Sequence, residues 1–179
     1  MKAILSFLVI LCASFTFGQK IKLTVLNQAD TTVHLVKYIG SKLYYADTAE
    51  IKGGRVEFNG AKQQPGMLGL LVPGQQVIEF IYNNEEVDLE TKGPNYNENM
   101  KVKKSEENKA FSEYVKYMTE KRNAAQKLNT DMTAQDKSSA KYKEMETQFK
   151  TMNSEVETYQ QNFLKTHSNK LVGKMVKMT

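Results

Sequence analysis

The sequence predicts an α+β chain: an N-terminal antiparallel β-sandwich or half-open barrel, then a long antiparallel helical hairpin and a short last helix. Short apolar stretches that alternate with polar residues fill residues 19–92, as in half-buried strands. Turn-forming residues, among them Gly93 and Pro94, begin a linker over residues 93–104. Beyond Pro94 the sequence has no proline, and apolar residues in the helical region 105–179 recur at spacings of three and four.

Residues 1–18 have the pattern of a secretory signal peptide, with Lys2, an apolar run of about ten residues and a small residue, Gly18, at the end. The run is shorter than the roughly 20 apolar residues that a transmembrane helix needs. A buried N-terminal element is the alternative, and a lipid anchor on Cys12 is disfavoured because large aliphatic residues precede it. We therefore expect an exported protein of the periplasm or outer cell envelope, with no transmembrane segment and a mature chain that begins at Gln19.

The β region contains strand patterns that are separated by turn signals. Residues 21–25 alternate apolar and polar side chains, and residues 32–38 form a second strand-like run. The pair Gly53-Gly54 predicts a two-residue hairpin, because such turns need positive φ. Pro73-Gly74 separates two further apolar runs, since proline presets φ at the first turn position and glycine tolerates the second. About seven short strands joined by such turns are typical of a small sandwich or half-open barrel.

The helical region begins with a capping signal at Ser105, followed by two glutamates that favour the positive end of the helix dipole. A first helix is expected to run to residue 128 and to turn at residues 129–131. Thr133 followed by Asp136 resembles a capping box, so a second helix is expected over residues 134–166. Residues 168–178 are expected to form the last short helix.

The second helix carries the most regular apolar pattern in the chain. Its apolar residues are spaced alternately by three and four positions over three heptads, the pattern of coiled-coil packing. The first helix can supply a partner for this helix seam by folding back on it. The helix seam is also the candidate interaction site, either with a protein partner of the envelope or in self-association. Its members are Tyr142, Met145, Phe149, Met152, Val156, Tyr159 and Phe163.

Few residues point to catalysis. Cys12 is the single cysteine and lies in the expected signal peptide, so the mature chain is expected to have no thiol. His34 and His167 have no second histidine or cysteine with which to bind zinc or iron. Residues 86–90 place three carboxylates on one face of a strand, which suits either acid–base work or calcium but is more typical of a solvated strand face. We expect no catalytic residue, no metal site and no cofactor, and hence no enzyme.

Charge is distributed unevenly along the chain. Residues 19–100 carry 8 Lys/Arg and 10 Asp/Glu, whereas residues 101–179 carry 16 and 10. The basic half is most simply a solvated helical surface, although it could also attract anionic lipid, polysaccharide or an acidic partner. A nucleic-acid partner is not expected for an exported protein. Tyr44, Tyr45 and Tyr96 are further candidates for exposed contacts.

Several stretches resemble one known family. They are residues 30–35 (DTTVHL), 43–49 (LYYADTA), 64–67 (QPGM), 72–75 (VPGQ), 80–85 (FIYNNE) and 103–111 (KKSEENKAF). The chain is similar in these stretches to the N-terminal portion of exported thioredoxin-like (redoxin) proteins of certain Gram-negative bacteria. The resemblance implies a β-rich domain of unknown function and a helical region that precede a thioredoxin-fold domain. In that family the redox chemistry belongs to the CxxC motif of the thioredoxin-fold domain, so no redox residue is carried over to this chain.

Three functions follow as hypotheses. The first is a non-catalytic accessory or interaction module of the bacterial cell envelope, which would position or dimerise a redox partner or bind another envelope component. The second is a periplasmic holdase-type chaperone or binding protein with basic helical arms. The third, a redox enzyme in its own right, is disfavoured because the mature chain is expected to lack cysteine. The resemblance also leaves open whether this sequence is part of a longer thiol–disulfide exchange protein or a relative that kept only the accessory part.

Overall fold

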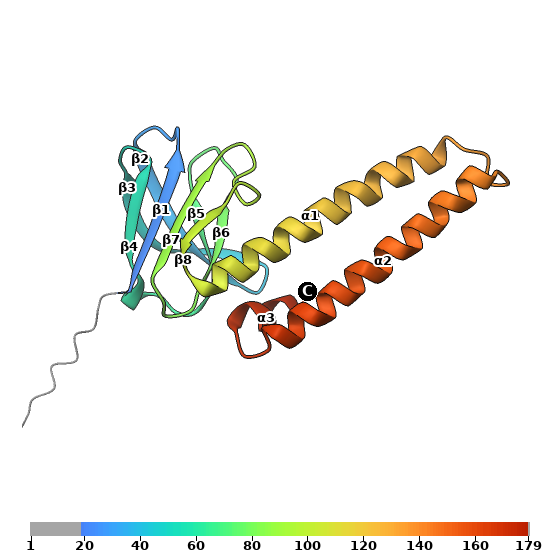
Figure 1. Cartoon of the computed structure of the whole chain (residues 1–179). Coiled ribbons are helices and arrows are strands. Elements are labelled where there is room, and N and C mark those ends of the chain that lie inside the picture. Colours follow the sequence, from blue (N-terminus) through green and yellow to red (C-terminus); the bar gives the residue numbers. More distant parts are fainter. Residues whose placement is uncertain (1–18, 179) are drawn as a thin grey trace, which may run out of the picture.

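The computed structural model describes residues 19–178; the expected signal peptide with Cys12 lies outside the described residues, as does Thr179. The α+β class is confirmed, since two four-stranded sheets are followed by two long helices and a short one (Figure 1). One sheet has the strand order β4-β1-β7-β8 and the other β3-β2-β5-β6. The strands are β1 (Lys20–Leu26), β2 (Thr31–Ile39), β3 (Lys42–Ile51), β4 (Arg55–Asn59), β5 (Gly66–Leu71), β6 (Ile78–Tyr82), β7 (Val87–Lys92) and β8 (Lys101–Lys104).

The predicted alternation places one face of each sheet in a shared core. Ile21, Leu23 and Val25 of β1 are buried between exposed or half-exposed neighbours, as the two-residue period requires. The second sheet contributes Leu35, Phe80 and other residues from its facing side. Full burial of each such aliphatic or aromatic side chain stabilises the fold by about 1.5–3 kcal/mol.

The hairpin predicted at Gly53-Gly54 is present between β3 and β4, and both glycines have positive φ, 54° and 74°. Two features of the sheets differ from the sequence-based expectation. β1 and β7 pair in parallel, from Ile21 opposite Val87 to Leu26 opposite Lys92, so not every pair is antiparallel. The stretch expected to be a linker contributes β8, which pairs with β7. The β1–β7 pairing joins segments far apart in the chain, so no local pattern encodes it, whereas β8 pairs with the strand just before it.

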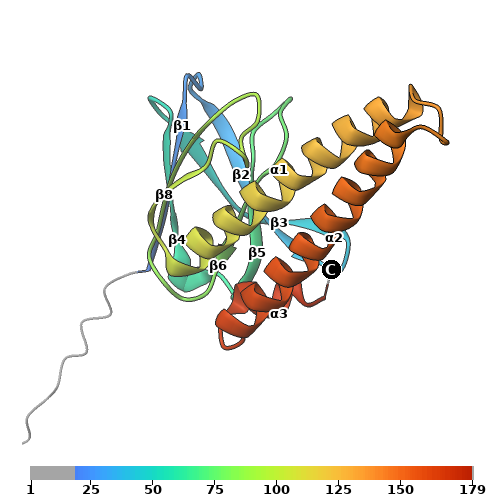
Figure 2. The ribbon, with the colours of Figure 1, turned by 45° about the vertical axis from the view of Figure 1, so that its right-hand side comes forward.

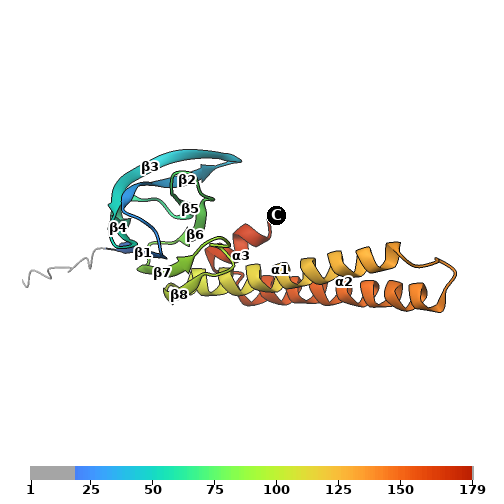
Figure 3. The same ribbon diagram turned by 90° about the horizontal axis from the view of Figure 1, so that it is seen from above.

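Three helices follow the sheets: α1 (Glu106–Thr133), α2 (Ala140–Thr166) and α3 (Leu171–Val176). α1 and α2 lie side by side as an antiparallel hairpin that projects from the sandwich (Figures 1 and 3). We call this projecting pair the arm. The predicted cap of α1 is confirmed, since the Ser105 hydroxyl accepts a hydrogen bond from the backbone N–H of Asn108 at 2.9 Å.

The turn between α1 and α2 lies further along the chain than predicted. Residues 129–131 are helical, and α1 continues to Thr133. α2 is capped by Ser139, whose hydroxyl accepts from the N–H of Tyr142 at 3.1 Å, so the predicted capping box at Thr133 is wrong. Asp136 instead accepts from the backbone N–H and the hydroxyl of Ser138, which organises the loop before the helix. Thr133 and Ser139 can both cap a helix, and sequence spacing alone does not show which of them does so.

The base of the arm packs against the outer face of the second sheet (Figure 2). Ile81 of β6 is buried there with Ala110 of α1, Phe163 of α2 and Val172 of α3. The Glu107 carboxylate is also buried. It accepts hydrogen bonds from the backbone N–H groups of Leu171 and Val172 at 3.0 and 2.8 Å and from the Asn83 side chain at 2.8 Å. These contacts join α3, α1 and the β6–β7 connection.

Candidate interaction surfaces

The helix seam of α2 faces α1 along the arm. Phe163 is buried at the base, and the other six seam residues are half-buried. The rings of Tyr117 and Tyr159 stack with centroids 3.7 Å apart, and Phe163 lies 4.8 Å from Tyr114. Tyr159 and Phe163 of the helix seam therefore contact aromatic rings of α1, and these rings hold the proximal half of the arm together.

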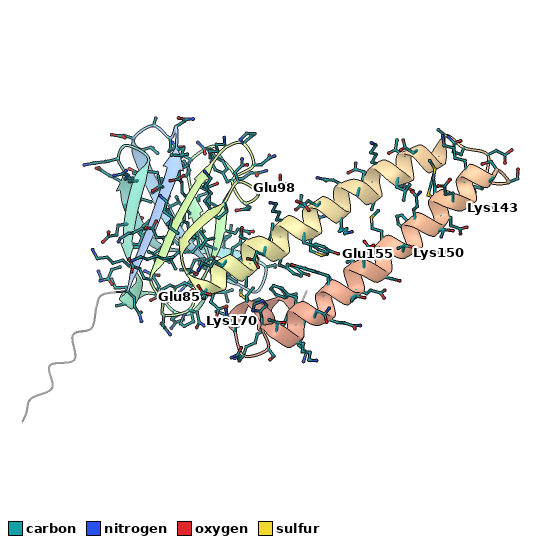
Figure 4. All side chains as sticks on the ribbon, viewed as in Figure 1. Glu85, Glu98, Lys143, Lys150, Glu155 and Lys170 are labelled. Atoms are coloured by element: carbon teal, nitrogen blue, oxygen red, sulfur yellow. The ribbon has the colours of Figure 1, made fainter. Side chains whose placement is uncertain are left out.

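A lysine interrupts the apolar pattern of α1 and is accommodated by pairing across the arm. The Lys121 ammonium lies 2.5 Å from the Glu155 carboxylate and 5.5 Å from the Tyr117 ring centroid. Glu155 lies on α2, within the arm (Figure 4). Hydrogen bonding to Glu155 raises the pKa of Lys121. The contact lets a cation occupy a position that the heptad pattern would otherwise give to an apolar side chain.

The arm is thin, because it is only two helices wide. From residue 111 to residue 162, all of which the structure describes, no side chain is buried. Two shallow hollows of about 470 and 290 Å³ lie between the helices on one flank, and Thr151 and Glu155 line both of them. The remaining lining is largely uncharged: Tyr117, Thr147, Gln148, Met152, Ser154, Thr158, Tyr159 and Asn162, together with Lys121.

The three carboxylates predicted to share a strand face do so, and lysines of the neighbouring strands pair with two of them. Glu86 lies 3.2 Å from the Lys22 ammonium and 2.9 Å from that of Lys104. Glu90 lies 2.7 Å from Lys103. Hydrogen bonds from Lys104 and Lys22 hold the pKa of Glu86 below its ordinary value, and the hydrogen bond from Lys103 does the same for Glu90. This arrangement is an ion-paired outer face of the first sheet.

This ion-paired face predicts an acid-sensitive contribution to stability. The lowered pKa of Glu86 means that its contribution is present above the ordinary value of 4.5 and is lost as pH falls through the folded-state value. The melting temperature of Glu86→Gln should lie below that of the wild type at neutral pH, and the gap should close on acidification. Thermal melts across pH measure the gap. The same substitution at exposed Glu157 of α2 should show no such pH-dependent gap, and a gap at Glu86 that persists in acid would contradict the prediction.

A hollow of about 480 Å³ lies on this same outer face, and its lining includes Arg55, Asp88 and Lys103. Within residues 19–178, no group of three or more His, Cys, Asp or Glu side chains is placed to hold a metal ion.

His34 lies 3.0 Å from the Thr48 hydroxyl and edge-on to the Tyr45 ring at 4.9 Å. His167 ends α2 and packs on Phe163 at 4.5 Å. The two histidines thus lie in different parts of the fold.

The sequence identified Tyr44 and Tyr45 as candidate contacts without placing them. The structure puts both on β3, where they are 44% and 70% exposed. Ile39 and Leu43 are exposed beside them, so the end of the β2–β3 hairpin carries four large apolar side chains. Tyr96 is different, since it is half-buried against the core and bonds to Gln75. Exposure on an edge strand depends on sheet order, which the sequence pattern does not contain.

Among the described helices, none combines the length and the apolar character that a membrane crossing requires.

The fold and surfaces define an α+β chain whose sandwich supports a projecting helical arm. The model of one protein family, described as "Domain of unknown function (DUF4369)", matches residues 19–111. This match covers the sandwich and the start of α1, and the chain belongs to that family. Neither the curated proteins nor the solved structures contain a match to the chain.

Proposed function

We propose that this protein is a non-catalytic accessory module of the bacterial cell envelope, and that its arm holds a protein partner. The observation that carries the proposal is the arm itself: two helices of 28 and 27 residues that project from the sandwich without burying a side chain between residues 111 and 162. A helix pair that serves only stability gains little from such length, because most stability comes from packing of buried apolar faces. A surface built for contact explains the length.

The flank with the two hollows is the favoured contact surface. Its lining is mostly threonine, serine, tyrosine and methionine, and Lys121 and Glu155 neutralise each other there. Small uncharged side chains let another helix approach closely, and methionine and tyrosine adapt to varied partners. We infer that the partner presents an amphipathic helix to this flank, in the helix-in-groove mode of recognition.

The location and the partner class rest on the sequence. The pattern of residues 1–18 supports export. The resemblance of stretches such as residues 30–35 and 103–111 to exported thioredoxin-like proteins supports a partner or an attached domain in thiol–disulfide exchange. In this proposal the chain positions the redox component and does not perform the chemistry, since its single cysteine is Cys12.

Site-specific photocrosslinking in the cell envelope tests the arm. A photoreactive residue at Thr151 or Thr158, both on the hollowed flank, should give adducts with a second protein that mass spectrometry can identify. The matched control is Asn153, which is exposed on α2 and does not line either hollow. Adduct yield at Thr158 should fall about tenfold when Thr151→Arg is added, because an arginine in a packed contact costs at least about 1.4 kcal/mol.

Several outcomes would count against the proposal. Equal adducts at Thr151 and Asn153, or none at either, would remove the hollowed flank as a binding surface. Adducts with many unfolded envelope proteins, together with suppression of their aggregation, would favour the holdase-type chaperone instead. Thiol–disulfide turnover by the purified protein would contradict the non-catalytic assignment.

A further inference from the structure

Three of the four sheet edges are protected against pairing with another strand. At β6, Asn108 pairs with the backbone of Ile81 as a neighbouring strand would: its side-chain oxygen accepts from the N–H at 2.8 Å, and its amide nitrogen donates to the carbonyl at 2.7 Å. The Asn97 oxygen accepts from the Glu79 N–H at 3.0 Å. β6 therefore has its outward backbone groups satisfied at two successive sites.

The edges of the first sheet are protected in other ways. β8 is only four residues long and reads Lys-Val-Lys-Lys. Short length and lysine are common devices against edge-to-edge association. β4 is five residues long and lies against β3, to which Gly53-Gly54 connects it.

The edge of β3 is the exception. β3 pairs with β2 on one side only and lies at the rim of the sandwich (Figure 3). Its first four residues, Lys42 to Tyr45, are all exposed. Beyond the bulge at Ala46, the Asp47 carboxylate accepts from the N–H of Thr48 at 2.8 Å and closes the edge. The open stretch therefore ends at the bulge.

We propose that the open edge of β3 pairs antiparallel with β3 of a second copy of this chain. Lys42 and Asp47 bracket the exposed tyrosines, and neither has an ion-pair partner within residues 19–178. They oppose Ile39 and Leu35 of β2, four residues apart, so they point to the same face. A two-fold axis near Tyr44 and Tyr45 places each Lys42 beside the other copy's Asp47, whereas a parallel pairing would bring like charges together.

The tyrosines supply the apolar part of this contact. Tyr45 is the most exposed aromatic ring of the hairpin and is held against the His34 ring, which is itself fixed by Thr48. A ring that is already ordered loses little conformational entropy on association. Pairing of the two edges would also satisfy backbone groups of Lys42–Tyr45 and join the two second sheets into one continuous sheet.

The pairing is tested with two variants, each of which reverses one charge of the Lys42–Asp47 contact. Sedimentation velocity over a wide concentration range measures their dimerisation. The purified wild-type protein should dimerise. Lys42→Glu alone puts two acidic pairs in the contact, and Asp47→Lys alone puts two basic pairs there, so each variant should raise the dimer dissociation constant at least about tenfold. An equimolar mixture of the two variants should recover the wild-type affinity, because both contacts in the heterodimer are then oppositely charged.

The control is Lys62→Glu, which reverses an exposed lysine away from β3 and should leave the dimer unchanged. A wild-type protein that stays monomeric overturns the proposal, and so does a dimer that neither single variant weakens. Failure of the mixture to recover affinity, with both variants folded by circular dichroism, overturns the antiparallel register. Thr151→Arg on the arm should not affect the dimer, which keeps this test separate from that of the partner-binding arm.

Discussion

Phe163→Ala is expected to reduce the free energy of unfolding by about 3–5 kcal/mol, the range for truncating a buried phenylalanine. Phe163 is 6% exposed and lies where α1, α2 and α3 meet Ile81 of β6. Its ring contacts Tyr114 at 4.8 Å and His167 at 4.5 Å. The substitution removes the centre of this cluster, so the arm should loosen from the sandwich before the sandwich itself unfolds. Urea titration followed by circular dichroism measures the loss.

Phe149→Ala is the matched control for Phe163→Ala, because Phe149 belongs to the same helix seam but is only half-buried. A partly exposed ring loses less apolar contact when truncated, so the expected cost is clearly smaller. Equal losses from the two substitutions would show that the distal arm is packed as tightly as its base, contrary to the exposure of its side chains.

Asn108→Ala is also expected to lower the free energy of unfolding strongly, through lost hydrogen bonds rather than lost packing. Asn108 is 2% exposed and satisfies both the N–H and the carbonyl of Ile81. Alanine leaves two buried backbone groups without partners, each at about 1–3 kcal/mol, so the expected loss of stability is about 2–6 kcal/mol. Hydrogen exchange at the Ile81 amide should accelerate, which a loss of helix propensity alone would not cause.

Two comparisons sharpen the Asn108 prediction. Asn108→Asp retains an acceptor for the Ile81 N–H but brings a carboxylate against the Ile81 carbonyl, so it should also destabilise the protein. Asn153→Ala, at an exposed site on α2, should change stability by no more than about 0.5 kcal/mol. An Asn108→Ala protein as stable as the wild type would show that the β6 edge is not held by this side chain.

Local chemistry made several parts of the fold predictable. Ser105 caps α1 as expected, because its hydroxyl needs only the next turn of the same helix. Gly53-Gly54 forms its hairpin because glycine has no Cβ and adopts the positive φ that the turn requires. The helix seam on α2 follows from a heptad repeat, which places its apolar residues on one face of the helix.

Other parts depend on which segments meet in space. β8 carries one apolar side chain among three lysines, and its strand character comes from pairing with β7. Lys103 and Lys104 also form ion pairs with Glu90 of β7 and with Glu86, which directly precedes it. Asn108 and Glu107 read in the sequence as ordinary first-turn residues of a helix. Their buried hydrogen bonds to Ile81, Leu171 and Val172 arise only when α1 docks on β6 and α3 folds back.

By itself, the sequence determined the α+β class, the alternation that fills the core, the cap of α1 and the helix seam, because each depends on neighbours within a few residues. Only the tertiary structure decided that β1 and β7 run parallel, that Asn108 protects the edge of β6 and that the edge of β3 stays open. Strand order and edge protection depend on contacts between distant segments, and the free energy of those contacts is a property of the assembled fold.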